Sequence, residues 1–367
     1  MMQKRLLITL AVLMSMIITG CSIQPMRMVL VESESVENKA GISIIDINAP
    51  ENEHNSIEFT EKSNGIWYFK WTMDEDIKQK SPCQVKYHDL YYSISHFMVV
   101  EGSIGNGEKY PIVLDTGGST SAIIVHDIHV IKSKLSIYPL GFSKDFLLGG
   151  FCYLPELQIG NITFINFPAL YQKKHVEVQA FGVPISRDKS IIIGLPVLKQ
   201  FKYIRFDNIR KVAEFSLNNV FECNESNRWE QYPFLIKEDS ESNAELFVKI
   251  PIAGKDMELR LDTGAGGGLA ISEDLWKEIS KRIQKVNLKD DTTLYPFYGR
   301  LACKSGVISK FKSGDIIIEK VKISVFPNDS KLMIQGNPKG LLGMQFFEKS
   351  VMVLDFERQL IWVKRQK

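Results

Sequence analysis

Two stretches of the sequence decide the fold: PIVLDTG at residues 111–117 and LRLDTG at residues 259–264. In each, an apolar run ends in the triplet Asp-Thr-Gly, which predicts a buried strand that delivers a carboxylate to a tight glycine turn. Burying a carboxylate is costly unless it has a partner or a task. Two such carboxylates in one chain suggest a pair that shares one site, holds one proton between its members and activates water.

An internal repeat supports this pairing. Each Asp-Thr-Gly triplet is followed by an apolar-apolar-Gly segment and later by an aspartate at the end of another apolar run. These landmarks recur at nearly one offset: Asp115 and Asp262 (262 − 115 = 147), Gly194 and Gly343 (343 − 194 = 149), and Asp207 and Asp355 (355 − 207 = 148). A constant offset over three landmarks indicates a duplicated structural unit.

At these residues the chain resembles the aspartic peptidases, over roughly residues 90–365. The resemblance implies a mainly β, bilobal aspartic-protease-like fold, with two similar retropepsin-type β lobes and the active site between them. Each half is similar to one retropepsin lobe, which carries Asp-Thr-Gly, then a flap hairpin, then the apolar-apolar-Gly support of the catalytic loop. The tandem resembles a pepsin-type enzyme or a single-chain version of a retropepsin dimer.

The resemblance also assigns roles to the residues of the two triplets. Asp115 and Asp262 take the catalytic positions. The remaining positions support the catalytic loops: Thr116 and Thr263, which lock the two loops together by hydrogen bonds, and Gly117 and Gly264, where the backbone passes close to the substrate. The flap hairpins that would close over a bound peptide are expected at about residues 138–153 and 295–310.

The sequence departs from the pepsin pattern three positions after each catalytic Asp. Pepsin-like enzymes usually carry Ser or Thr there, whose hydroxyl donates a hydrogen bond to the carboxylate. This chain has Gly118 and Ala265, and the alanine is similar to retropepsins. Because such donors stabilise the ionised carboxylate, their loss predicts a pair that titrates at higher pH.

Composition excludes several other classes of function. The chain has 367 residues, enough for two domains, and a formal net charge of +2, which gives no electrostatic footprint for nucleic acid. No cysteine or histidine spacing indicates a metal site, so no metal and no cofactor are expected. The glycine-rich stretch at residues 264–268 fails the dinucleotide-binding spacing, because Leu269 stands where the third glycine is required.

The N-terminus resembles a bacterial lipoprotein signal. Lys4 and Arg5 precede an apolar stretch at residues 6–18 that is short for a membrane span, and Thr19-Gly20 leads into Cys21. We expect Cys21 to be lipidated, which would anchor the protein outside the cytoplasm, at the outer membrane in a Gram-negative cell. An ordinary signal peptide or an N-terminal anchor helix would also produce a basic and then apolar start.

The organisation expected along the chain follows from these signals. Helical patterns are few, and the best one is residues 272–283, where a Ser-Glu-Asp start precedes apolar residues at i, i+4 and i+8. The expected segments are a signal peptide at 1–21, a polar tether with a possible extra strand at 22–88, the first lobe at 89–217, an inter-lobe linker at 218–238 and the second lobe at 239–367.

Two hypotheses of function follow. The first is an aspartic endopeptidase that hydrolyses peptide or protein substrates as a monomer, with its lobes forming an intramolecular pseudo-dimer. The second is a non-catalytic peptide-binding or structural lipoprotein that keeps the fold. The presence of both Asp and both Thr residues favours the enzyme, because a chain that had lost catalysis could have lost either carboxylate.

Overall fold

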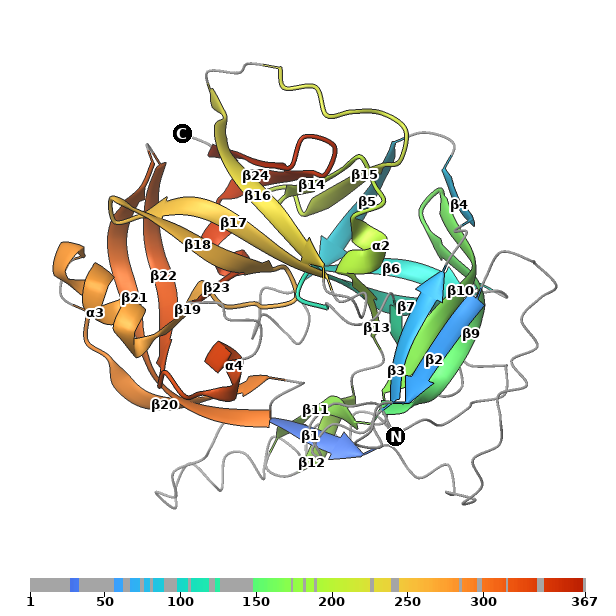
Figure 1. The fold of residues 1–367 in the computed structure, drawn as a ribbon, viewed down its shortest axis with the longest axis horizontal. Coiled ribbons are helices and arrows are strands. Elements are labelled where there is room, and N and C mark those ends of the chain that lie inside the picture. Colours follow the sequence, from blue (N-terminus) through green and yellow to red (C-terminus); the bar gives the residue numbers. More distant parts are fainter. Residues whose placement is uncertain are drawn as a thin grey trace, which may run out of the picture.

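The protein is described by a computed structural model. It describes residues 27–32, 56–61, 67–72, 76–79, 82–88, 98–104, 107–118, 123–125, 148–172, 174–180, 183–187, 190–224, 228–238, 244–283, 286–295, 299–314, 316–334 and 340–365. The fold is mainly β, and the strands form two lobes of similar construction (Figure 1). The first lobe is coloured cyan to green and the second yellow to red.

The first lobe is built from hairpins that the glycine turns predict. Its strands are β5 (Cys83–His88), β6 (Val99–Ile104), β7 (Glu108–Asp115), β8 (Ile123–Val125), β9 (Leu148–Ile159), β10 (Ile162–Gln172) and β13 (Ile191–Gly194). The Gly160-Asn161 pair is a hairpin signal in the sequence, and β9 and β10 pair across it. The φ of Gly160, 57°, is the left-handed conformation that a tight hairpin turn requires. Strand β13 lies between β7, to which it is parallel, and β8, to which it is antiparallel.

The second lobe repeats this arrangement. Its elements are β17 (Ala244–Ile252), β18 (Lys255–Asp262), β19 (Leu269–Ser272), α3 (Glu273–Ile279), η3 (Ser280–Arg282), β20 (Lys289–Tyr295), β21 (Gly299–Ser313), β22 (Ile316–Phe326) and β23 (Gly340–Gly343). Strand β23 is parallel to β18 and antiparallel to β19, as β13 is to β7 and β8. The predicted helix is confirmed, and its Ser272 side chain accepts a hydrogen bond from the Leu275 N–H, as an N-cap does.

A six-stranded antiparallel sheet joins the two lobes. Its order is β5, β15 (Val212–Ser216), β14 (Tyr203–Asp207), β24 (Ser350–Asp355), β25 (Leu360–Arg365) and β16 (Glu230–Glu238). In the central pair, Tyr203 faces Asp355 and Asp207 faces Val351. Since the repeat offset is 148, this register is two-fold symmetric about the pair Arg205 and Val353. Figure 1 shows these strands above and between the two lobes.

The repeated aspartates Asp207 and Asp355 shape the hairpin turns of this sheet. Asp207 Oδ1 accepts a hydrogen bond from the Arg210 N–H at 2.9 Å, and Asp355 Oδ1 accepts one from the Arg358 N–H at 3.0 Å. In each turn the next residue, Lys211 or Gln359, has a left-handed φ of 57° or 55°. The two turns are therefore the same structure, which explains why the aspartate recurs in the sequence.

The core runs through both lobes as one large apolar cluster. Strands β13 and β23 are buried at all four positions, whereas β17 alternates buried and exposed residues over part of its length. Continuous burial is expected for a strand covered on both faces, and alternation for a strand with one solvent face. The apolar-apolar-Gly segments are thus central strands, and a short helix follows each of them directly.

Further elements complete the fold. They are β1 (Arg27–Glu32), β2 (Ser56–Glu61), β3 (Trp67–Thr72), β4 (Asp76–Gln79), β11 (Lys174–Ala180), β12 (Val183–Arg187), α2 (Leu195–Leu198), α4 (Lys331–Ile334) and η4 (Met344–Phe347). Strand β3 carries an aromatic run, and it pairs with β2 in a sheet of its own. Strands β1 to β5 all lie within residues 22–88, the segment expected as a tether with one possible extra strand, and β16 lies within the segment expected as a linker.

The predicted signal segment, with Cys21, lies outside the described residues. No helix in the described part of the chain is long and apolar enough to cross a membrane. Cys83, Cys223 and Cys303 are free thiols.

Candidate active site

Both Asp-Thr-Gly triplets lie where a strand leaves its sheet. Asp115 ends β7 beside Gly194, and Asp262 ends β18 beside Gly343. Each triplet then turns back, with the N–H of Gly118 or Ala265 donating to the carbonyl of its own aspartate at 3.1 Å. The chain after the parallel strand secures the turn, because Leu195 N–H donates to Gly118 O and Met344 N–H donates to Ala265 O.

The two turns are joined by four hydrogen bonds that the threonines make. The Thr116 N–H donates to Thr263 Oγ1 at 2.9 Å, and the Thr263 N–H donates to Thr116 Oγ1 at 3.0 Å. Each hydroxyl also donates across the interface: Thr116 Oγ1 to Leu261 O at 2.9 Å, and Thr263 Oγ1 to Leu114 O at 2.6 Å. Both threonines are buried, so this symmetric network fixes one loop against the other.

Each glycine of the triplets lies against the carboxylate of the opposite half. A Cβ atom built on Gly117 would stand 2.4 Å from Cγ of Asp262, and one built on Gly264 would stand 2.4 Å from Cγ of Asp115. Both distances are far below van der Waals contact, so only glycine fits at either position. The two carboxylates therefore lie together at the junction of the loops.

The paired carboxylates have unequal surroundings. Asp115 is buried, and its Oδ1 accepts a hydrogen bond from the Gly117 N–H at 2.8 Å. Asp262 is half-buried, yet its Oδ1 is covered and has no hydrogen-bond partner among the described residues. Burial, the negative charge of Asp262 and a hydrogen bond with Asp262 raise the pKa of Asp115 well above its ordinary value. Such a pair carries one proton over a wide pH range.

A cation from the second lobe adjoins this pair. The guanidinium of Arg260, in β18, donates from Nη2 to Gly117 O at 3.0 Å, and its Nη1 lies 3.0 Å from Oε1 of Glu245, in β17. The positive charge of Arg260 lowers the pKa of Asp115 and so opposes the larger effects of burial and Asp262. Sequence reasoning missed both residues, although Arg260 interrupts an apolar run two positions before Asp262, on the same face of the strand.

The structure also locates the two positions that lack hydroxyls. A Cβ on Gly118 would lie 3.5 Å from Oδ2 of Asp115, so a hydroxyl side chain there would reach the carboxylate. Ala265 packs instead against an apolar cluster in the second lobe that includes Phe326 and Met333, with Tyr295 beside it. Neither Gly118 nor Ala265 therefore offers a side-chain hydroxyl that could donate a hydrogen bond to the carboxylate of its own half.

The expected flaps are only partly visible. The second candidate begins at Tyr295, the last residue of β20, and covers most of β21, with Tyr295 paired to Gly299. The turn between them, at residues 296–298, lies outside the described part. In the first candidate, residues 138–147 are likewise outside the described ranges, and residues 148–153 begin β9.

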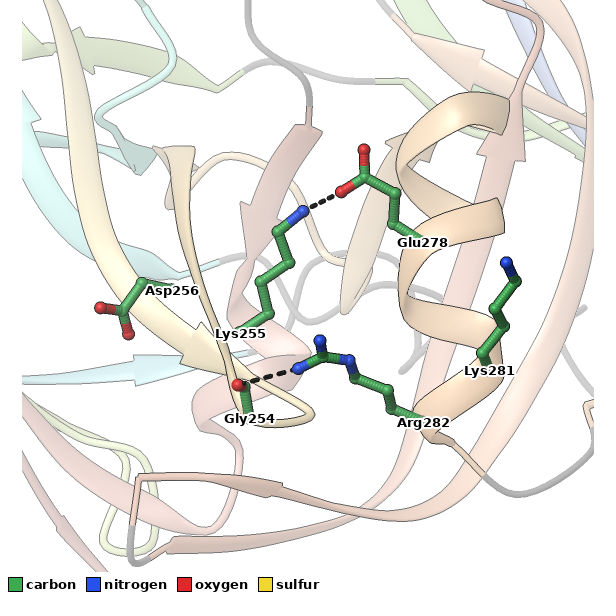
Figure 2. Close-up of a pocket in the computed structure, with 6 residues that line it drawn as sticks. All are labelled: Gly254, Lys255, Asp256, Glu278, Lys281 and Arg282. Carbon is green, nitrogen blue, oxygen red and sulfur yellow. Dashed lines mark hydrogen bonds and ion pairs between the residues drawn. The ribbon is translucent and has the colours of Figure 1, made fainter.

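A surface hollow of about 710 Å³ lies elsewhere, between the β17–β18 turn and α3 (Figure 2). It is lined by Gly254, Lys255, Asp256, Glu278, Lys281 and Arg282. Lys255 pairs with Glu278, and Arg282 Nη1 donates to Gly254 O at 3.1 Å. Since Lys255 and Asp262 stand at opposite ends of an eight-residue strand, roughly 20 Å separates this hollow from the pair. Among the described residues, no group of three or more His, Cys, Asp or Glu side chains could hold a metal ion.

One comparison with known proteins gives a family match in the second lobe. Residues 248–346, which contain Asp262, match the family described as "Aspartyl protease". No curated protein sequence matches the chain. Among solved structures, one similar chain is Basic 7S globulin from soybean, with 10% sequence identity, a TM-score of 0.41, and coverage of 78% of this chain and 97% of that one. The second half thus contains an aspartyl-protease-type domain.

Proposed function

We propose that the protein is an aspartic endopeptidase that hydrolyses peptide bonds with water activated by Asp115 and Asp262. One observation carries this proposal: four threonine hydrogen bonds and two close glycine contacts hold two carboxylates together, one from each half of the chain. A structural role would not require a carboxyl pair in which burial of Asp115, followed by repulsion from Asp262, raises the pKa of Asp115 well above its ordinary value.

The proposed mechanism is general acid–base catalysis without a covalent intermediate. The ionised carboxylate of the pair takes a proton from water while the protonated carboxyl donates to the scissile carbonyl oxygen, and the roles reverse as the amine leaves. The proton belongs to the pair rather than to either residue. Thr116 and Thr263 keep the two carboxylates at a fixed separation, because their hydrogen bonds join the loops directly.

The direct test is cleavage of a diverse peptide pool by the chain from residue 22 onward, with products mapped by mass spectrometry. We expect cleavage that requires both aspartates. A peptide carrying a tetrahedral hydroxyl in place of the scissile bond should bind far more tightly than the plain peptide, since only a catalytic pair offers one donor and one acceptor to such a centre. Equal affinities by calorimetry, with no product formed, would favour the non-catalytic peptide-binding protein.

The pH dependence follows from the raised pKa of Asp115. Activity requires one proton on the pair, and this proton is lost only as pH rises through the raised pKa, so the alkaline limb of the profile moves upward. We expect the maximum between mildly acidic and neutral pH. A maximum in strong acid, at about pH 2–3, would contradict the role given to the missing hydroxyls at Gly118 and Ala265.

We also propose that a lipid on Cys21 anchors the enzyme outside the cytoplasm. The basic and then apolar start of the chain, with small residues before the cysteine, supports this. The full chain should partition into detergent and take up a fatty-acid probe in bacterial cells, and Cys21→Ala should stop the labelling. Equal labelling of the variant would mean that lipid is attached elsewhere.

A further inference from the structure

We propose that Arg260, held by Glu245, is a positioning residue that fixes the Asp115 loop against the second lobe and sets the pH range over which the Asp pair works. This inference rests on the peptidase function proposed above. It concerns one ion pair, whose arginine stands where the first half of the chain has Val113.

The contacts of Arg260 make it a bridge between the lobes. Its side chain is 11% exposed and that of Glu245 is 20% exposed, so the ion pair is largely removed from water. From the same guanidinium, Nη2 donates to the carbonyl of Gly117. A planar guanidinium can bind a carboxylate and a carbonyl at once in fixed directions, which an ammonium group cannot do. Arg260 therefore adds a fifth hydrogen bond between the loops to the four that the threonines make.

The hydrogen bond from Arg260 to Gly117 matters for the chemistry because Gly117 contacts both carboxylates. Gly117 donates its own N–H to Asp115 Oδ1, and its α-carbon lies against the Asp262 carboxylate. Arg260 holds the carbonyl of Gly117, the residue that contacts both carboxylates. It therefore fixes the peptide unit between Gly117 and Gly118. A displacement of about 1 Å at a reacting group can lower a rate by roughly 100-fold.

The charge of Arg260 also acts on Asp115. Asp115 is affected by the charges of Asp262 and Arg260, both from β18, and Glu245 on β17 faces Arg260 itself. Strand β13, which packs beside Asp115, carries no ionisable side chain. In the first half, the position equivalent to Arg260 is Val113 (260 − 147), which is buried and apolar. Only the second half carries a cation at this position, and its positive charge favours loss of the proton from the pair.

The test compares four variants of the full chain. Arg260→Met removes the charge and the hydrogen bonds at similar length, Arg260→Lys keeps the charge alone, and Glu245→Gln removes the anion that partly neutralises Arg260. Arg282→Met is the matched control, because Arg282 is exposed and also donates to a glycine carbonyl, in the distant hollow of Figure 2. For each variant, kcat and KM are measured against pH on one cleaved peptide.

The expected results differ in sign between the variants. Arg260→Met should lower kcat by about 10- to 100-fold, with a smaller change in KM, and should move the alkaline limb to higher pH, because the lost cation no longer favours deprotonation. Arg260→Lys should leave the limb near its wild-type position and recover only part of kcat. Glu245→Gln should move the limb to lower pH, and Arg282→Met should change neither quantity.

A second measurement does not depend on catalysis. Since the pKa of Asp115 is raised on folding, its stabilising effect is present at low pH and is lost as pH rises through the folded-state pKa. The pH of this loss, read from thermal unfolding, should be higher in Arg260→Met than in the wild type, and adding Asp115→Asn to both proteins should abolish the difference.

The outcomes separate this inference from the proposed function. If the wild type cleaves and Arg260→Met retains its kcat and both limbs of its pH profile, the role of Arg260 is wrong and the peptidase stands. If the wild type cleaves nothing, the peptidase proposal fails, and the positioning role in catalysis fails with it. The unfolding experiment then still decides whether Arg260 acts on the ionisation of Asp115.

Discussion

The first half of the chain presents Asp115 at the end of β7, and the second presents Asp262 at the end of β18. In both halves a parallel strand ending in glycine supports the loop, a threonine crosses to the opposite loop, and a later aspartate shapes the turn of the central sheet. The halves differ in what surrounds the carboxylates: Val113 against Arg260, and Gly118 against Ala265. The two halves therefore share the contacts that hold their loops together. They differ in the groups that affect the ionisation of the carboxylates.

The largest expected effect tests whether the two aspartates act as one unit. Asp115→Asn and Asp262→Asn should each lower kcat by about three orders of magnitude or more, because either change removes half of the acid–base pair. The double variant should be no worse than either single one. Kinetics on a cleaved peptide decide this, with thermal unfolding as the control for folding. Near-normal activity in one single variant would contradict a shared site.

The next effect tests the symmetry of the glycine contacts. Gly117→Ala and Gly264→Ala should each lower kcat by about 100-fold, because the new methyl group would push the opposite carboxylate out of place. Gly267→Ala is a matched control in the same loop, since a Cβ there meets no atom within 4 Å. A large loss in only one of the two variants would show that the carboxylates are not held equivalently.

The threonine network should show equal energies in the two halves. Thr116→Val and Thr263→Val keep the side-chain shape but leave a buried N–H and a buried carbonyl without the hydroxyl. Each should lower the free energy of unfolding by about 2 kcal/mol. Urea denaturation measures this, and the double variant should be less destabilised than the sum, because the residues share one network. Losses that differ by more than about twofold would break the symmetry.

The smallest expected effect is the difference in stability between two variants, one in each repeated turn of the central sheet. Asp355 is fully buried and accepts hydrogen bonds from the Arg358 N–H, the Arg358 guanidinium and Trp362 Nε1. Asp207 accepts one from the Arg210 N–H, and its arginine partners are 3.8 and 4.0 Å away. We expect Asp355→Ala to lower the free energy of unfolding by about 2–3 kcal/mol and Asp207→Ala by about 1 kcal/mol. Equal losses of stability in the two variants would mean that the hydrogen bond within the turn accounts for the whole effect, and that the additional partners of Asp355 contribute nothing.

The sequence predicted the parts of the structure that repeat. Both aspartates, both apolar-apolar-Gly strands and the hairpin at Gly160 could be identified because a turn or a buried strand constrains residue type locally. The site was found by the same route, since the offset of 147 aligned the two triplets. The role of the pair in catalysis remains a prediction.

The features that the sequence did not predict depend on contacts between distant residues. Arg260 and Glu245 are fifteen positions apart on neighbouring strands, and the Gly117 carbonyl lies 143 positions away from Arg260. A charged residue in a strand usually faces solvent, so the place of Arg260 two positions before Asp262 does not by itself distinguish it from an exposed arginine. Similarly, β16 begins in a polar region, and it is a strand because β17 and β25 pair with it.

The register between β14 and β24 has a consequence for the protein as it is synthesised. Strand β14 is complete at residue 207, but its partner ends at residue 355, so 148 further residues must be added before the pair can form. At ribosomal rates of 5–20 residues per second, the edge of β14 stays open for roughly 7 to 30 seconds. An apolar strand edge that has no partner can pair with a neighbouring nascent chain. The central residue of β14 is Arg205, at the symmetry axis, where a charge discourages such pairing until Val353 arrives.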